Sequence, residues 1–406
     1  MTTYYVSKTG NNGNGLSLAN AKTTIAAGLA LLSSGDTLLI NDGTYTEGIF
    51  DTIPAGISAS QETLIQAINS NLVIVNGVNA FGNIVTIFNK NYIRLKDIIF
   101  DGANATDDYL VTFRTTGTTG DPGCHFCVIE GGKIRNFTAT NAQSGIFLAN
   151  ANSFCEMINI EVYNISSPSP FGNGTHGIYI RGTDHIVRNC IIRDNSYWGI
   201  HQYEDNTETS HRCVFKNNKV YGNKSGIRIG DGNDNIAFNN LIYDNNNNFI
   251  PSSDHPGIVI SNGSRNHVYN NTIYGHNTWS ILIFLGSGAV VDPIIRNNIL
   301  FANANDDIAT FGGSPTNLVE DHNLKGTNPL FVDETNKDFH LTSSSPAINA
   351  GFNLAGIVDF DYDGIVRPQT SIWDIGAYEF SNPTTGSLLL NIRDTLNKRI
   401  VSSQIF

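Results

Sequence analysis

Short apolar runs alternate with polar turn residues along most of the chain, and inside each run the apolar side chains occupy every second position. Three successive runs, residues 177–181, 199–203 and 226–230, begin with Gly and alternate strictly. A period of two places successive side chains on opposite faces of a strand. We therefore predict three adjacent strands. The side chains expected to point inward are Ile178, Ile180, Ile200, Gln202, Ile227 and Ile229.

These runs belong to a longer repeat. An Asn that shortly precedes two apolar residues recurs at positions 189, 217, 239, 270 and 297, in steps of 28, 22, 31 and 27 residues. A Gly-Ile phrase recurs in phase with it at positions 145, 177, 199, 226 and 257. A variable but bounded period of this length is typical of a solenoid whose insertions lie in loops. Since little helical pattern separates the runs, leucine-rich and α-helical solenoids are excluded, and an all-β parallel β-helix of about nine or ten coils is predicted.

The two ends of the chain depart from the repeat. Residues 21–32 carry an apolar stripe at Ile25, Leu29 and Leu32, which predicts an amphipathic helix that caps the N-terminal end of the β-helix. After residue 338 the period is lost, which predicts an irregular β cap over the C-terminal end. The predicted segments are an N-terminal cap (1–47), the parallel β-helix (48–338), a C-terminal cap (339–380), and a linker, tail or start of a further module (381–406).

The composition limits the classes of molecule that the chain is expected to bind. Charged residues make up 15% of the chain and the formal net charge is −12, so the chain lacks the basic footprint of a nucleic-acid-binding protein. The sequence has no run of roughly 18 apolar residues that would span a membrane, and residues 1–10 show no signal-peptide pattern. We expect a monomer that is secreted or lies on the cell surface, with no nucleic-acid partner and no membrane span.

The cysteines fit the repeat. Cys127, Cys155 and Cys213 fall at equivalent positions of their coils, with His185 at the same position in the coil between them, so an inward stack is expected. Neighbouring coils lie about 4.8 Å apart, which allows a Cys127–Cys155 disulfide. The favoured interpretation is free, buried cysteines that pack as small apolar groups. A metal or redox motif at Cys124 and Cys127 is not favoured, because no second pair accompanies it.

Ionisable outward residues concentrate on three consecutive coils. The outward positions of the Gly-Ile strands carry the catalytic candidates Tyr179, Arg181, His201, Tyr203 and Arg228. In β-elimination of a uronan, a base removes the C5 proton, a cation neutralises the adjacent carboxylate and an acid protonates the leaving oxygen. We assign His201 as the base, Arg228 or Arg181 as the carboxylate clamp, and Tyr179 or Tyr203 as the proton donor.

Other polar and aromatic residues flank these strands, and they leave alternatives open. The substrate-binding candidates are His176, Trp198, Glu204, Asp205, Asp231 and His255, with Trp198 expected to stack on a sugar. Glycoside hydrolysis needs two carboxylates roughly 5–9.5 Å apart, which Glu204 or Asp205 together with Asp231 would supply. An Asp cluster would equally suit Ca²⁺ in a metal-assisted lyase. Outward Tyr and Arg are also compatible with glycan binding without turnover, as in an adhesin or a tailspike.

The chain resembles the right-handed parallel β-helix proteins of the pectate-lyase-like superfamily over about residues 4–380. Besides the repeat, the resemblance rests on the N-terminal letters YYVSKTG and SGDTLLINDGTYTEG and on the C-terminal letters NPLFVDETNKDFHLTSSSPAINAG, DFDYDGIVRP and WDIGAYEF. It implies a secreted bacterial protein that acts on an acidic polysaccharide, but not which reaction, since lyases, epimerases, glycosidases and tailspikes share this architecture. The use of His, Tyr and Arg is similar to that of some β-helix lyases and mannuronan epimerases, although the epimerases' Asp-Pro-His signature is absent. We expect a polysaccharide lyase, with a hydrolase, a C5-epimerase or a non-catalytic glycan-binding protein as alternatives.

One acidic motif lies outside these strands. Asp359, Asp361 and Asp363, followed by Gly, copy the first half of a calcium-binding loop. Thr370 stands at the twelfth position, where such loops carry Glu, and no helices are expected on either side. The alternative is an Asp/Gly turn that pairs with Arg367. The sequence requires no cofactor, and Ca²⁺ is the one that it allows.

Overall fold

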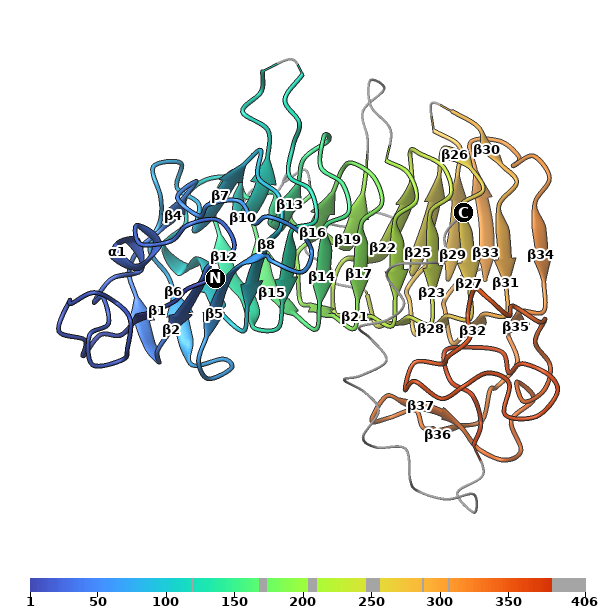
Figure 1. Ribbon diagram of the computed structural model, residues 1–406. Coiled ribbons are helices and arrows are strands. Elements are labelled where there is room, and N and C mark those ends of the chain that lie inside the picture. The colour runs from blue at the N-terminus through green and yellow to red at the C-terminus, as the bar shows by residue number, and fades with distance from the viewer. Residues whose placement is uncertain are drawn as a thin grey trace.

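Three long parallel sheets dominate the computed structural model (Figure 1), and they wind around a common core as a parallel β-helix. The structure describes residues 1–118, 120–167, 174–203, 210–245, 256–286, 288–305 and 307–381. Within these residues the three sheets, here called A, B and C, contain twelve, eleven and ten strands. The predicted all-β solenoid is therefore confirmed. None of the described helices is long and apolar enough to cross a bilayer.

The sheets are built from short strands, one per sheet in each coil. Sheet A contains β1 (Thr3–Val6), β2 (Thr37–Ile40), β5 (Thr63–Ala67), β8 (Ile93–Lys96), β11 (Val128–Glu130), β14 (Glu156–Ile158), β17 (Ile186–Arg188), β20 (Val214–Lys216), β23 (Ile236–Phe238), β27 (His267–Tyr269), β31 (Ile294–Arg296) and β34 (Val319–Asp321). Sheet B contains β3 (Gly43–Tyr45), β6 (Val73–Val75), β9 (Ile99–Asp101), β12 (Lys133–Thr138), β15 (Glu161–Ser166), β18 (Ile191–Arg193), β21 (Lys219–Tyr221), β24 (Leu241–Tyr243), β28 (Thr272–Tyr274), β32 (Ile299–Phe301) and β35 (Leu324–Lys325).

Sheet C carries the Gly-Ile strands. It contains β4 (Ile49–Phe50), β7 (Val85–Phe88), β10 (Tyr109–Arg114), β13 (Ser144–Leu148), β16 (His176–Ile180), β19 (Trp198–Gln202), β22 (Ser225–Gly230), β25 (Ile258–Ser261), β29 (Ile281–Phe284) and β33 (Ile308–Phe311). The smaller elements are helix α1 (Ile25–Leu29), the 3-10 helix η1 (Gly102–Asn104), the pair β26 (Gly263–Ser264) and β30 (Val290–Val291), and the antiparallel hairpin of β36 (Phe331–Asp333) and β37 (Asp338–Leu341).

The two residues of each repeated Asn-Asn pair have different tasks. The first, at positions 217, 239, 270 and 297, has a φ between 48° and 60°, a left-handed conformation that Asn adopts more readily than most residues. The second points inward and is buried. Side-chain amides of Asn218, Asn240, Asn271 and Asn298 bond to one another in series over 2.9–3.1 Å. The Asn repeat therefore turns the chain between sheets A and B and satisfies the buried amides of that corner.

The interior follows the predicted alternation. All six side chains expected to point inward from β16, β19 and β22 are fully buried, and the Gln202 amide donates to the Asn235 side chain. Cys127, Cys155, His185 and Cys213 occupy one register position in sheet A, as predicted. All five cysteines are buried and none is bridged.

The predicted capping helix at residues 21–32 is not seen. Helix α1 has only five residues, and it begins after Thr24, whose hydroxyl accepts a hydrogen bond from the Ala27 amide. Lys22 is extended instead and forms backbone hydrogen bonds with β1. The apolar stripe was real, since Ile25 and Leu29 are buried against the first coil. Strand pairing at one side of the stripe shortened the helix.

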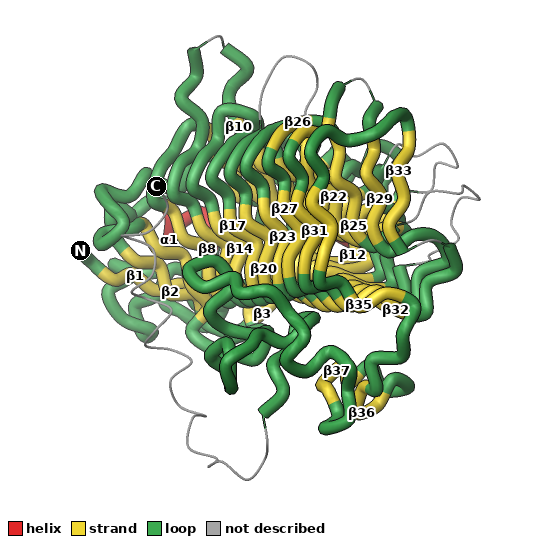
Figure 2. The backbone as a smooth tube through the Cα atoms, turned by 90° about the vertical axis from the view of Figure 1, so that its right-hand side faces the viewer, coloured by secondary structure: helices red, strands yellow, loops and turns green. Residues whose placement is uncertain are grey.

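The C-terminal segment, residues 327–381, lies along the side of the β-helix and not across its end, which corrects the predicted position of the cap (Figures 1 and 2). Outward residues of sheet B, such as Leu241 and Tyr243, form an apolar cluster with Phe339 and Tyr378 of this segment. Corner side chains donate to its backbone carbonyls. They are Asn217 to Asp361 and Tyr362, Asn239 to Phe360, Asn270 to Asp374 and Gly376, and Asn297 to Phe352. The C-terminal segment thus covers the apolar side chains on the outer face of sheet B.

Candidate active site on sheet C

Parallel pairing brings the predicted outward residues together in register. Tyr179 pairs with His201, and His201 pairs with Arg228 on the next strand. The same column continues from Phe147 on one side to Val259 on the other. A strand spacing of about 4.8 Å then holds the phenol, imidazole and guanidinium groups within reach of one substrate. The register that the repeat predicted for these coils is confirmed.

The central feature of this face is a contact between two histidines. The Nδ1 atom of His201 lies 3.0 Å from the Nε2 atom of His176, and the ring centroids are 4.1 Å apart. His176 is 5% exposed and His201 is 8% exposed. The remaining ring nitrogens, Nδ1 of His176 and Nε2 of His201, are buried and have no hydrogen-bond partner within the described ranges. We call these two residues the histidine pair.

The surroundings of the histidine pair favour uncharged imidazoles. Burial, and to a smaller extent the charge of Arg228, lowers the pKa of His176 to about 3. Burial also lowers the pKa of His201 well below its usual value, and His176, Arg228 and Arg181 lower it further. Both rings are therefore neutral at neutral pH. A neutral imidazole that has an unpaired nitrogen is able to accept a proton.

Three aromatic rings stack around His201. Its centroid lies 5.2 Å from that of Tyr179, 5.8 Å from that of Trp198 and 5.4 Å from that of Tyr203, with interplanar angles of 21°, 10° and 19°. Trp198 is 7% exposed, so most of its surface packs against the protein. The sequence suggested that Trp198 stacks on a sugar, whereas in the structure its ring covers one side of His201. These contacts fix the imidazole orientation.

The two arginines of the site have different partners. The Arg181 guanidinium donates to the Tyr179 hydroxyl through Nε (3.2 Å) and Nη2 (2.9 Å), and it lies over the same ring. Arg228 forms an ion pair with Asp231 (2.9 Å) and donates to the Ser261 hydroxyl (3.1 Å). Asp231 therefore acts as a counter-ion to Arg228. The bonds of Arg181 to the Tyr179 hydroxyl place its guanidinium beside the predicted proton donor.

Sequence reasoning missed a lysine at the edge of this face. Lys224 directly precedes β22 and is 3% exposed, and its Nζ atom lies 4.5 Å from the centre of the Tyr197 ring. Its backbone amide donates to the Tyr197 carbonyl, so the two residues occupy neighbouring coils at the same level. The signal was available, because Lys224 stands one residue before β22, as Tyr197 stands one residue before β19. Lys224 adds a third cation to the site.

Sequence reasoning also missed a series of hydrogen-bonded side chains on the preceding coils. The Tyr109 hydroxyl donates to Gln143 (3.0 Å), and the Gln143 amide donates to Asp108 (3.0 Å). Tyr109 stacks on Phe147 with a centroid distance of 4.3 Å. Burial, followed by the charge of Asp107, raises the pKa of Asp108. These residues precede the first Gly-Ile phrase used to align the coils, and only the register of β10 with β13 places them beside the site.

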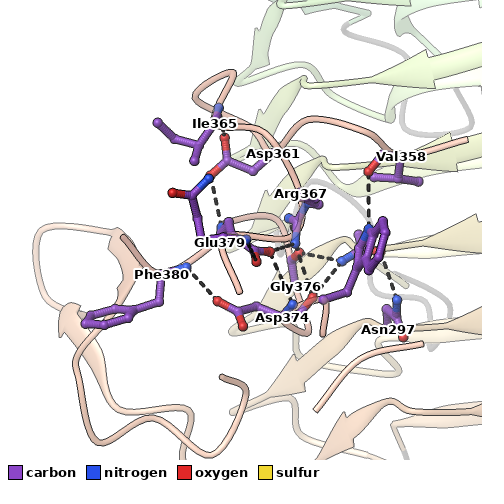
Figure 3. Close-up of polar contacts among 12 residues, drawn as sticks. Asn297, Val358, Asp361, Ile365, Arg367, Asp374, Gly376, Glu379 and Phe380 are labelled. Carbon is purple, nitrogen blue, oxygen red and sulfur yellow. Dashed lines mark hydrogen bonds and ion pairs between the residues drawn. The ribbon is translucent and has the colours of Figure 1, made fainter. Parts of the chain in front are cut away.

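Three of the predicted substrate-binding residues, Glu204, Asp205 and His255, lie outside the described residues. The predicted Ca²⁺ ligands are described, and each carboxylate has a protein partner, as Figure 3 shows for Asp361. Asp361 is buried and accepts hydrogen bonds from the backbone amides of Asp363, Ile365 and Glu379. Asp359 accepts from the Gly356 amide, whereas Asp363 contacts the His340 imidazole. No group of three metal-ligating side chains converges in the described ranges, so this arrangement gives the calcium expectation no support.

The alternative interpretation of this motif, an Asp/Gly turn beside Arg367, agrees better with the geometry. Arg367 forms an ion pair of 2.8 Å with Glu379, and both side chains are almost completely buried (Figure 3). Burial raises the pKa of Asp361 to about 6, although backbone donors and the charge of Arg367 oppose the shift. The motif therefore forms the polar core of the C-terminal segment.

Comparisons with known proteins agree with this architecture. The family described as right-handed β-helix region matches residues 126–298 and 206–348. Among solved structures, pectate lyase Pel9A is 18% identical with a TM-score of 0.62, covering 94% of this chain and 97% of its own. XylC in complex with xylose is 11% identical with a TM-score of 0.59 (94% and 99%), and a rhamnogalacturonan lyase is 14% identical with a TM-score of 0.54 (82% and 91%). Identities this low show the fold alone. A sequence search of curated proteins gave no match.

Proposed function

Because the chain belongs to the right-handed β-helix family, we propose that sheet C binds an acidic polysaccharide and that the protein is a polysaccharide lyase. Two of the similar structures are named as lyases, and a third is in complex with xylose. The reaction would be β-elimination at a uronic acid. The observation that carries the proposal is a buried His201, with a lowered pKa, between Tyr179 and Arg228 on neighbouring strands of one sheet.

The charge of this face supports an anionic substrate. Within one residue of β16, β19, β22 and β25, the described cations are Arg181, Lys224 and Arg228, whereas Asp231 is the described carboxylate. This local excess of positive charge contrasts with the formal net charge of −12 for the whole chain. A cationic face on an acidic protein favours binding of a polyanion such as a uronan.

Each step of the elimination has a residue available. His201 would remove the C5 proton, since its pKa lies below neutral pH and the ring is unprotonated. Arg181 would neutralise the uronate carboxylate, because a planar guanidinium matches both carboxylate oxygens. Tyr179 would protonate the leaving oxygen. Its hydroxyl oxygen accepts hydrogen bonds from Arg181, whose positive charge would stabilise the phenolate that forms.

Hydrolysis and epimerisation are the alternatives. A hydrolase needs two carboxylates with separate roles, and Asp231 is already bonded to Arg228 and Asn262. A C5-epimerase would begin with the same proton removal by His201. It is the stronger second candidate, because the site that supports proton removal also supports it. Glycan binding without turnover is the third.

A substrate panel separates these functions. We would incubate the protein with pectate, alginate and glycosaminoglycans, with Ca²⁺ or with a chelator, and follow ultraviolet absorbance and reducing ends. Rising absorbance from unsaturated uronides is the expected result. Reducing ends without absorbance would identify a hydrolase instead. If neither signal appears, proton exchange at C5 would identify an epimerase, and its absence would leave binding alone.

A matched pair of variants tests the clamp. Arg181→Lys keeps the charge but loses the planar fork, so we expect a loss of kcat/KM of about tenfold or more. Arg212→Lys is the control, because Arg212 pairs with Asp184 on the exposed surface away from sheet C. Equal rates for the two variants would contradict the assignment of Arg181.

A further inference from the structure

The hydrogen bond within the histidine pair has a direction, because one ring donates and the other accepts. A neutral imidazole carries one N–H and one lone pair. At a separation of 3.0 Å, one of the two facing nitrogens donates and the other accepts. If His201 Nδ1 donates to His176 Nε2, then the lone pair of His201 lies on its Nε2 atom. If His176 donates instead, then Nε2 of His201 carries the proton and is unable to act as a base.

We propose that His176 is a positioning residue that accepts the Nδ1 proton of His201, so that the two imidazoles work as one proton-handling unit. This inference rests on the proposed function, which requires a lone pair on Nε2 of His201 and so selects the direction of the hydrogen bond. The geometry behind it stands by itself: a direct contact between the rings, burial of both, and one unpaired nitrogen at each end within the described residues. The unpaired nitrogen of His201 is the position where a substrate proton would arrive.

The fold holds His176 in place for this contact. Gly174 has a φ of +71°, and a Cβ atom built there would lie 2.6 Å from Cε1 and 2.7 Å from Nε2 of His176. The residue at position 174 therefore has to lack a side chain for the ring to reach His201. Tyr179 and Tyr197 pack beside the His176 ring at centroid distances of 5.2 and 5.5 Å. These contacts leave the imidazole few alternative orientations.

The proton balance of the unit is simple. His201 Nε2 accepts the C5 proton of the substrate, and the C–H electron pair stays on the substrate. The Nδ1 proton of His201 then moves to Nε2 of His176, so that His201 is neutral again and His176 carries the positive charge. The unit as a whole has gained one proton. Loss of that proton to solvent after product release restores the starting state, and no other reactant is needed.

The charged groups around the histidine pair oppose a positive charge on either ring. The described groups that face it are Tyr179, Arg181, Tyr197, Tyr203 and Arg228, with Lys224 beyond the Tyr197 ring. The cations among them disfavour protonation of either ring in the free protein. A bound uronate would offset part of this repulsion.

A spectroscopic test of the polarity needs no substrate. We would label the protein with ¹⁵N-histidine and record long-range ¹H–¹⁵N correlations of the imidazoles at neutral pH, with His176→Gln and His201→Gln used to assign the two rings. The expected result is a neutral His201 ring protonated at Nδ1 and not at Nε2. A His201 ring protonated at Nε2 would overturn the proposal, whether or not the protein turns out to be a lyase.

A kinetic test uses two substitutions of His176. His176→Gln keeps a carbonyl oxygen able to accept the Nδ1 proton, whereas His176→Phe keeps the ring shape without an acceptor. We expect His176→Phe to lower kcat by about 10²-fold with KM little changed, and His176→Gln to recover part of the loss. Removing the repulsion from His176 also raises the pKa of His201, so the acidic limb of the kcat/KM profile of His176→Gln should move to higher pH.

Controls separate this role from simple packing. His125→Gln changes a histidine that bonds to Ser153 outside the site, and it should leave the rate and the pH profile unchanged. Gly174→Ala should displace the His176 ring and reproduce the kcat loss of His176→Phe. If His176→Gln and His176→Phe lose activity equally and the acidic limb stays in place, then His176 has only a structural role and the proposal is wrong. Failure of every variant and of the wild type to act on any glycan would instead count against the proposed function.

Discussion

Two regions of this molecule place histidines against aromatic rings, with opposite electrostatic results. On sheet C, the imidazoles of His176 and His201 contact each other and lie near two arginines, and their pKa values are lowered. In the C-terminal segment, His340 stacks on Tyr378 at a centroid distance of 3.9 Å and bonds to two carboxylates. Hydrogen bonding to Asp363 is the largest cause of a rise in the pKa of His340 to about 9, with Asp338 contributing.

The difference between the regions lies in the charges that surround each ring. Aromatic stacking occurs in both and does not decide the protonation state. Carboxylates on two sides keep His340 positively charged, which suits a structural ion pair. Burial together with neighbouring cations keeps His201 neutral, which suits a base. The arginines of the two regions differ in burial. Arg367 pairs with Glu379 in the interior of the C-terminal segment, whereas Arg228 pairs with Asp231 on a surface strand.

The largest effect should come from exchanging the histidines for alanine. His201→Ala should lower turnover on the responsive glycan by about 10²–10⁴-fold, since the base is removed. His340→Ala should leave turnover unchanged, because His340 lies in the C-terminal segment. Initial rates by ultraviolet absorbance, with circular dichroism to confirm folding of both variants, provide the measurement. Similar losses of rate in the two would remove the functional distinction between the regions.

The buried ion pair of the C-terminal segment should give the next effect. Glu379→Gln leaves the guanidinium of Arg367 without its counter-charge in a dry environment, so the free energy of unfolding should fall by about 3 kcal/mol or more. Asp234→Asn is the matched control, because its partner Arg265 is exposed and solvent screens such pairs, so the loss of stability should be small. Urea unfolding curves measure both. An equal, small loss in the two variants would show that burial adds nothing to this pair.

A smaller effect should follow pH through His340. Its pKa is raised on folding, so the stabilisation from its carboxylate partners is fully present below the ordinary value of 6.5 and disappears as the pH rises through about 9. Because the side chain is partly exposed, the gain should stay below about 1 kcal/mol. Melting temperatures of wild type and His340→Gln at pH 6, 7.5 and 9.5 test this. The gap should close at high pH, and a gap that widens with pH would reverse the assigned charge.

The smallest effect on stability is expected from reduction of the cysteines in the core of the β-helix. All five cysteines are buried and unbridged, so a reducing agent should leave the melting temperature unchanged. A Cys127–Cys155 disulfide would add about 3–4 kcal/mol by constraining the unfolded chain, and its reduction would lower the melting temperature by several degrees. Thermal scans with and without reductant separate these outcomes.

The sequence determined the coil and its register. Strict alternation fixes which side chains face inward, and the spacing of the Gly-Ile and Asn phrases fixes which residues of successive coils pair, because both follow from local backbone geometry. This was sufficient to place Tyr179, His201 and Arg228 on neighbouring strands. It was also sufficient to stack Cys127, Cys155 and Cys213.

Only the tertiary structure decided the contacts that cross this register. One coil step aligns Ile178 with Ile200, and therefore His176 with Trp198, yet the His176 imidazole reaches diagonally to His201. Likewise, the apolar outer face of sheet B needed a cover, and the C-terminal segment packs there instead of across the end. A periodic pattern specifies backbone positions and the face of each side chain. The direction that a side chain takes on that face, its burial and its pKa depend on neighbours from other coils, which no single repeat encodes.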